Sequence, residues 1–274
     1  MRHGGFDGRG EWEAKTVTGM RELVAGIAAC RIVDLSSDVS THADGPFRTE
    51  LEVLEPGPGA AFFCQHVLPE LVPEAVGRFR PEDFPDGAFL RHEMVRASVH
   101  AGSHVDAPGH YGPAGAGGRV NEAPLRSFIG QGFRWDVRDV PERVIGLRHV
   151  DPAARVADGV GPAGAIGLIH TGGAKAIGAD VVEAFIDAGI TVIGTDAASF
   201  DGPFPPMIEE YLATGDRDVL WPAHMLGRRR PYYQLERLHN LAALPEQGFL
   251  VIAFPVLIDG ATAAWTRAVA LVPS

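Results

Sequence analysis

The stretch SVHAGSHVDAPGHYG, residues 98–112, decides how the rest of this sequence is interpreted. It places three histidines and an aspartate within eleven positions: His100, His104, Asp106 and His110. In an α-helix the first two histidines would share a face and Asp106 would point elsewhere, whereas in an extended chain all three side chains point to one side. A straight strand would separate the Cα atoms of His100 and His104 by about 13 Å. We therefore expect an extended chain that bends or bulges at Gly102–Ser103.

The residue types in this stretch favour a metal site. Two imidazoles and a carboxylate with open positions suit zinc or manganese, and such an ion activates water and polarises a carbonyl. His110 would then be available as a general acid and base. The alternative is a polar loop whose histidines bond to backbone groups, because an isolated His-x3-His pair is a weak signal. Asp106 in phase with the histidines and the glycine-rich segment 109–120 favour the metal site.

The surrounding sequence predicts a mixed α/β fold. Residues 165–173 and 190–197 are apolar runs typical of buried strands, and the amphipathic segment 178–189 between them predicts a helix, so together they indicate a β-α-β unit. Asp196, at the end of the second run, is expected to bond to backbone amides rather than to take part in catalysis. The remaining expectations are a helix over 17–29, strands over 31–36, 89–100, 248–259 and 264–272, and a loop over 109–120.

Composition excludes several function classes. The 274-residue chain carries a net charge of −11, which argues against nucleic-acid and anionic-membrane partners. No apolar run reaches the roughly 18 residues of a membrane span. The two cysteines stand in no CxxC pattern and the N-terminus has no apolar core, so a cytoplasmic location is expected. We expect an N-terminal arm and helix over residues 1–30 and the main domain over residues 31–274.

The histidine stretch also resembles a known family. HAGSHVDAPGH is similar to the H-x-G-T-H-x-D-x-P-x-H signature of the metal-dependent cyclase family, which includes kynurenine formamidase-like hydrolases and isatin hydrolase. Ser103 stands where the family has threonine, and both residues carry a hydroxyl. The segments DLSS, IHTGG with GTDAASFD, NLAALPEQGF and TRAVAL extend the resemblance over residues 31–272. Residues 37–92 match poorly.

The resemblance implies a fold, a site and a reaction class. The fold would be a single mixed-sheet domain of the cyclase-like swivelling β/β/α type, assembled as a homodimer or homotetramer. By family analogy, His100, His104 and Asp106 would bind a metal ion and His110 would be the catalytic acid and base. His224 and Glu236 would bind a second ion, and Glu236 would also serve catalysis. One or two zinc or manganese ions are therefore expected.

Three functions remain open from the sequence. The first is a metal-dependent hydrolase that cleaves an amide, formamide or lactone bond of a small aromatic or cyclic substrate. The second is a biosynthetic cyclase or dehydratase that uses the same ion as a Lewis acid. The third is a non-catalytic binding protein stabilised by the metal, and the presence of both His110 and Glu236 argues against it, because a structural site needs no free acid or base.

Overall fold

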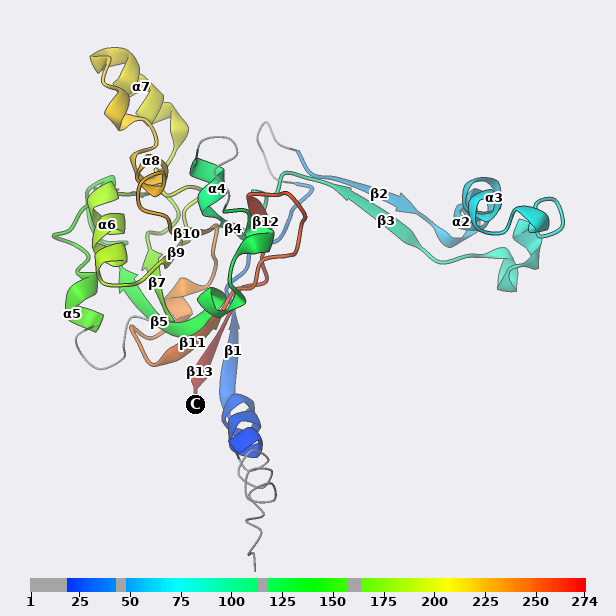
Figure 1. The fold of residues 1–274 in the computed structure, drawn as a ribbon, viewed down its shortest axis with the longest axis horizontal. Helices are drawn as coiled ribbons and strands as arrows, with labels where there is room; N and C mark the ends of the chain where they lie inside the picture. The colour runs from blue at the N-terminus through cyan, green and yellow to red at the C-terminus, as the bar shows by residue number, and fades with distance from the viewer. Residues whose placement is uncertain (1–18, 43–47, 113–117, 157–163) are drawn as a thin grey trace, which may run out of the picture. The chain divides into compact units, whose positions relative to one another are not determined.

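The computed structural model describes residues 19–42, 48–112, 118–156 and 164–274 (Figure 1). The contacts within the chain divide it into two units. We call residues 1–38 with 102–274 the sheet unit, and residues 39–101 the hairpin unit. The expected boundary between residues 30 and 31 stays a prediction. No described helix has both the length and the apolar character needed to cross a membrane.

The sheet unit is built on a nine-stranded mixed sheet. Its four middle strands run parallel to one another, and the strands on both sides are antiparallel to their neighbours. From one edge to the other, the strands are β1 (Cys30–Asp34), β13 (Val269–Pro273), β11 (Phe249–Ile252), β5 (Ile129–Asp136), β7 (Ala165–His170), β9 (Val192–Thr195), β10 (Tyr233–Glu236), β4 (His104–Asp106) and β12 (Ala263–Trp265). A small separate ladder pairs β6 (Val144–Ile145) with β8 (Ala176–Ile177).

The predicted β-α-β unit is confirmed. Strands β7 and β9 are parallel neighbours, and helix α6 (Ala179–Asp187) connects them in the sequence. Side chains alternate along β7: Ile166 and Leu168 join one apolar cluster, whereas Ile169 joins the other. This alternation shows that both faces of the strand are buried, which explains why it reads as a continuous apolar run.

Helices cover one face of the sheet (Figure 1). Their apolar residues, including Val182 and Phe185 of α6 and Leu226 of α8 (Pro222–Gly227), form one cluster with Ile169 and Ile193 of the strands. The other face packs mainly against irregular segments and short 3-10 turns. The sheet unit also contains α4 (Pro108–Tyr111), α5 (Pro152–Val156), α7 (Phe204–Thr214) and a helix over residues 19–28. Its described 3-10 turns are Val120–Glu122, Leu125–Phe128, Arg217–Val219 and Leu241–Ala243.

The hairpin unit contains two antiparallel strands, β2 (Glu50–Leu54) and β3 (His92–Arg96), joined by a helical segment. That segment holds α2 (Pro56–Phe62), a π-helical turn (Phe63–Val67), α3 (Leu68–Leu71) and three 3-10 turns (Pro73–Ala75, Pro81–Asp83 and Pro85–Gly87). Aromatic rings of Phe63, Phe84 and Phe89 pack together, with centroids 4.8 to 5.6 Å apart. This small aromatic cluster is the core of the unit.

Several expected boundaries are wrong. The strand expected over 89–100 ends at Arg96, and a turn and a bend lead from it to β4. The loop expected over 109–120 begins inside helix α4, because Pro108 occupies the first helical turn. The strand expected over 248–259 ends at Ile252. The strand expected over 264–272 is divided into β12, which forms one edge of the sheet, and β13, which lies next to β1 at the other edge. The helix expected over 17–29 is described over residues 19–28.

Candidate metal centre

Three buried side chains meet where β4 lies beside β10. His104 and Asp106 are two residues apart on β4 and therefore face the same side of the sheet. Glu236, at the end of β10, is the cross-strand partner of His104. The three residues are only 0%, 1% and 4% exposed. Two strands more than a hundred residues apart in the sequence thus place two carboxylates and an imidazole together.

The geometry of this trio suits a divalent cation. His104 Nε2 lies 3.5 Å from Asp106 Oδ1 and 3.4 Å from Glu236 Oε2. One donor atom from each side chain lies within 4.8 Å of the others. Burial opposes a charge on the imidazole, but hydrogen bonding to Asp106 and to Glu236 outweighs burial and raises the pKa of His104 to about 10. A donor set of one nitrogen and two carboxylate oxygens that favours a positive charge fits zinc or manganese.

A glycine and a serine shape the entry into β4. Gly102 has φ +63, and a Cβ at this position would lie 2.7 Å from the carbonyl oxygen of Asp38. The Ser103 hydroxyl donates to the carbonyl oxygen of Arg237 at 2.6 Å and accepts from the amide of Ser37 at 2.7 Å. The predicted bend at Gly102–Ser103 is confirmed, and serine supplies the hydroxyl at this position.

His110 lies at the edge of the trio. It belongs to the short helix α4, and its Nε2 is 3.8 Å from Asp106 Oδ2. Its side chain is 31% exposed, in contrast to the buried trio. The next residue fixes the helix, because the Tyr111 hydroxyl donates to the carbonyl oxygen of Tyr232 at 2.7 Å and Arg228 Nε donates to the carbonyl oxygen of Tyr111. His110 is therefore placed to exchange protons beside Asp106.

His224 approaches Glu236 from helix α8. Its Nε2 is 4.0 Å from Glu236 Oε1, and its ring centroid is 5.7 Å from that of His110. Burial opposes a charge on His224, but the hydrogen bond to Asp201 and the nearby Glu236 carboxylate raise its pKa. Within the sheet unit, the structure thus brings together the expected site residues His104, Asp106, His110, His224 and Glu236.

His100 is the sixth expected residue. It lies in a turn at the end of the hairpin unit, and its side chain is half-buried. Its backbone amide donates to Ser98 Oγ at 3.2 Å. The geometry that would place residues 100, 104 and 106 on one extended strand does not occur, because residues 99–103 form a turn and a bend. His100 as a metal ligand stays a prediction.

Two further residues contact the site, and the sequence analysis missed both. The backbone amide of Phe200 donates to Glu236 Oε1 at 2.9 Å. The Asp201 carboxylate accepts from His224 Nδ1. No spacing rule connects Asp201 with a histidine 23 residues later, so nothing in the sequence alone marks it.

Asp196 has the structural role that was expected. Its carboxylate accepts from the amides of Thr171 and Gly172 and from the Thr171 hydroxyl, at 2.7 to 2.9 Å. It therefore fixes the turn after β7 to the end of β9.

Comparisons with known proteins place this chain in a family. Residues 11–202 match the putative cyclase family. Kynurenine formamidase of Sphingopyxis alaskensis is 33% identical over 185 residues, which cover 62% of this chain and 76% of that protein.

Solved structures share the fold. Isatin hydrolase A from Labrenzia aggregata, bound to benzyl benzoate, superposes with a TM-score of 0.68 at 21% identity, covering 93% of this chain and all of that one. A predicted metal-dependent hydrolase from Bacillus stearothermophilus gives a TM-score of 0.60 at 16% identity, covering 89% and 98%. The expected mixed α/β fold is thereby confirmed, and the chain belongs to the putative cyclase family.

Proposed function

We propose that this chain is a metal-dependent hydrolase that cleaves an amide, formamide or lactone bond of a small aromatic or cyclic substrate. The observation that carries the proposal is the buried trio of His104, Asp106 and Glu236 with His110 at its edge. Relatives named kynurenine formamidase and isatin hydrolase support an amide C–N bond as the target.

The residues of the trio would hold a zinc or manganese ion, together with His100. When bound, a divalent ion supplies Lewis acidity toward a carbonyl oxygen and makes water a stronger nucleophile. His224 Nε2 lies 4.0 Å from Glu236 Oε1, so these two residues would together bind a second ion. Glu236 would then bind both ions.

His110 would move the proton. Its imidazole is partly exposed, whereas the carboxylate it faces, Asp106, is buried. In the hydrolysis His110 accepts a proton from the attacking water as the carbon–oxygen bond forms. It returns the proton to the leaving nitrogen or oxygen as the scissile bond breaks, so that the imidazole ends in its starting state.

The test combines metal analysis with turnover. Protein purified without added metal is analysed for bound zinc and manganese, and N-formylkynurenine, isatin and simple lactones are offered as substrates. We expect His104→Ala to lose the metal and the activity together. A His104→Ala variant that kept full metal content and full turnover would refute the assignment.

The same experiment separates the alternatives. A metal-loaded protein that hydrolyses none of these substrates would favour a cyclase or dehydratase, in agreement with the name of the family. Strong thermal stabilisation by the metal without turnover of any kind would favour a non-catalytic protein.

We further propose a homodimer or homotetramer. The hairpin unit exposes apolar side chains that a second copy could cover: Leu51 is 48% exposed, Met94 50% and Val95 53%. Burial of this apolar surface against a second copy would stabilise the two-stranded hairpin. The free cysteines and the acidic charge fit a cytoplasmic enzyme with a small-molecule substrate and with neither nucleic acid nor membrane as a partner.

A further inference from the structure

The start of helix α8 obtains its cap from a distant segment. Trp221, at the N-cap position, has φ 50 and provides no side-chain cap, and Pro222 follows it. The amides of the next residues need acceptors. Asp201 provides them, because its Oδ1 accepts from the Ala223 amide at 2.7 Å and its Oδ2 from the His224 amide at 3.3 Å. The Asp201 side chain is fully buried.

The same carboxylate fixes the His224 ring. Its Oδ2 lies 2.5 Å from His224 Nδ1. An ionised carboxylate is an acceptor only, so Nδ1 must carry the hydrogen. In the neutral ring Nε2 is then left with a free lone pair, and Nε2 is the nitrogen directed at Glu236, 4.0 Å from its Oε1. Asp201 therefore selects the tautomer that can bind a metal.

Phe200, the residue before Asp201, orients Glu236, the other predicted metal ligand that is distant in the sequence. The Phe200 amide donates to Glu236 Oε1 at 2.9 Å. Phe200 itself is fully buried in the apolar core, and its carbonyl oxygen accepts from the Ile177 amide at 2.7 Å. Two consecutive residues, both fixed by the fold, thus orient both His224 and Glu236.

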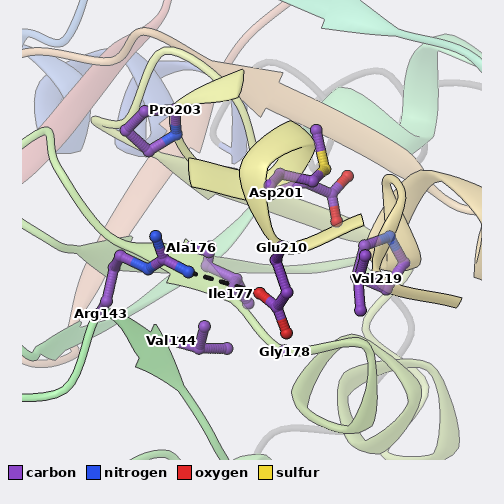
Figure 2. Close-up of a pocket in the computed structure, with 11 residues that line it drawn as sticks. Arg143, Val144, Ala176, Ile177, Gly178, Asp201, Pro203, Glu210 and Val219 are labelled. Atoms are coloured by element: carbon purple, nitrogen blue, oxygen red, sulfur yellow. Dashed lines mark ion pairs between the residues drawn. The ribbon is translucent and has the colours of Figure 1, made fainter. Parts of the chain in front are cut away.

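A pocket lies beside Asp201 (Figure 2). Its lining is mostly apolar and includes Met207 and Pro222, and the one cation among the described lining residues is Arg143, which is paired with Glu210 at 3.6 Å. The carboxylate of Asp201 makes its hydrogen bonds with residues of α8 and not with Arg143. The titratable group that Asp201 contacts is therefore the His224 ring.

We infer that Asp201 is a positioning residue that holds His224 in the tautomer and orientation needed for metal binding. The inference rests on the proposed function. Partners of this kind behind a metal-binding histidine are known to change metal affinity by about 10- to 100-fold.

The sharpest variant is Asp201→Asn. Its amide oxygen can still accept from the Ala223 amide, so that the shorter of the two hydrogen bonds that cap α8 is retained, whereas the 3.3 Å hydrogen bond from the His224 amide is lost. Its amide nitrogen would face His224 Nδ1 and donate to it, which forces the hydrogen onto Nε2. Asp196→Asn is the matched control, because Asp196 is also a largely buried carboxylate that accepts from backbone amides but does not contact the trio or His224.

Two measurements test the inference. Zinc and manganese are titrated into the metal-stripped wild type and both variants, and nitrogen-15 NMR of the metal-free proteins identifies the His224 tautomer above its pKa. We expect Asp201→Asn to weaken binding by about 10- to 100-fold and to move the hydrogen from Nδ1 to Nε2. Asp196→Asn should change neither. In a His224→Ala background, Asp201→Asn should cause no additional loss of metal affinity.

The outcomes are distinguishable from failure of the proposed function. Asp201→Asn with wild-type affinity and an Nδ1-protonated His224 would overturn the inference while leaving the proposed function intact. A wild type that binds neither ion would refute the proposed function. The NMR measurement would still show whether Asp201 sets the tautomer of His224.

Discussion

The Ser103 hydroxyl donates a 2.6 Å hydrogen bond to the carbonyl oxygen of Arg237. Ser103 immediately precedes His104, and Arg237 immediately follows Glu236. One hydrogen bond therefore joins the two chain segments that carry His104 and Glu236, the facing side chains of the candidate metal centre. The same hydroxyl accepts from the Ser37 amide, which connects the N-terminal segment to this point.

Ser103→Ala should weaken both the fold and the metal centre. The Ser103 side chain is buried, and loss of its hydroxyl removes two part-buried hydrogen bonds, those to the Ser37 amide and to the Arg237 carbonyl oxygen. The expected cost is about 0.5–1.5 kcal/mol of unfolding free energy for each hydrogen bond lost, together with lower zinc affinity. Ser103→Thr retains the hydroxyl and should stay near wild type in both respects. Urea unfolding and metal titration measure the two effects, and equal behaviour of the alanine and threonine variants would contradict this role.

Gly102→Ala tests the bend before β4. The substitution forces an alanine into the left-handed region, which costs roughly 1–2 kcal/mol, and places its Cβ 2.7 Å from the Asp38 carbonyl oxygen. The clash should add roughly 1–3 kcal/mol. Gly215→Ala is the control, because Gly215 has φ +71 but nothing within 4 Å of a Cβ. If both variants lost the same stability in urea, the close approach to Asp38 would be irrelevant.

The β-α-β unit was predictable because its signal is local. Residues 165–197 contain two apolar runs and an amphipathic segment in sequence order, and the structure places β7, α6 and β9 there. The bend at Gly102 was also predicted from a local pattern, because a straight strand would hold His100 and His104 too far apart to share an ion. The division of 264–272 was not predictable, because both halves are apolar. Residues 266–268 separate β12 from β13, and Thr266 among them bonds to the backbone of Ser103 and of Phe254.

The distant part of the site could not be derived from spacing. Glu236 reaches His104 through cross-strand pairing of β10 with β4, a register that no local pattern encodes. Family resemblance supplied His224 and Glu236 as site residues, but it did not indicate Asp201. Hydrogen bonds between distant segments are set by tertiary packing, so the positioning residues emerge only from the structure.

Asp136→Asn should remove a pH-dependent contribution to stability. Hydrogen bonding to Arg138 and to Arg134 holds the pKa of the Asp136 carboxyl well below its usual range. Because the folded pKa lies below the unfolded one, the stabilisation is fully present above about pH 4 and is lost as the pH falls through the folded value. The difference in unfolding free energy between wild type and variant should thus shrink from pH 6 to pH 2.

Glu246→Gln serves as the control for this effect. Glu246 pairs with Arg155 at 2.8 Å, but its side chain is 69% exposed, so solvent screens the pair. Its urea unfolding should follow the wild type across the same pH range. A constant difference between Asp136→Asn and wild type at every pH would contradict the ionic origin of the stabilisation.

His110→Gln should separate catalysis from metal binding. The His110 side chain is 31% exposed and lies at the edge of the trio, 3.8 Å from Asp106, so the buried donors remain when it is replaced. Glutamine cannot exchange a proton near neutral pH, and loss of a general acid and base costs about 10²- to 10⁴-fold in turnover. Metal content by elemental analysis should stay at the wild-type level while kcat falls by that factor. His149→Gln, which replaces a histidine paired with Glu142 outside the site, should keep both. Loss of metal from His110→Gln would make His110 a ligand, and full turnover would remove it from the mechanism.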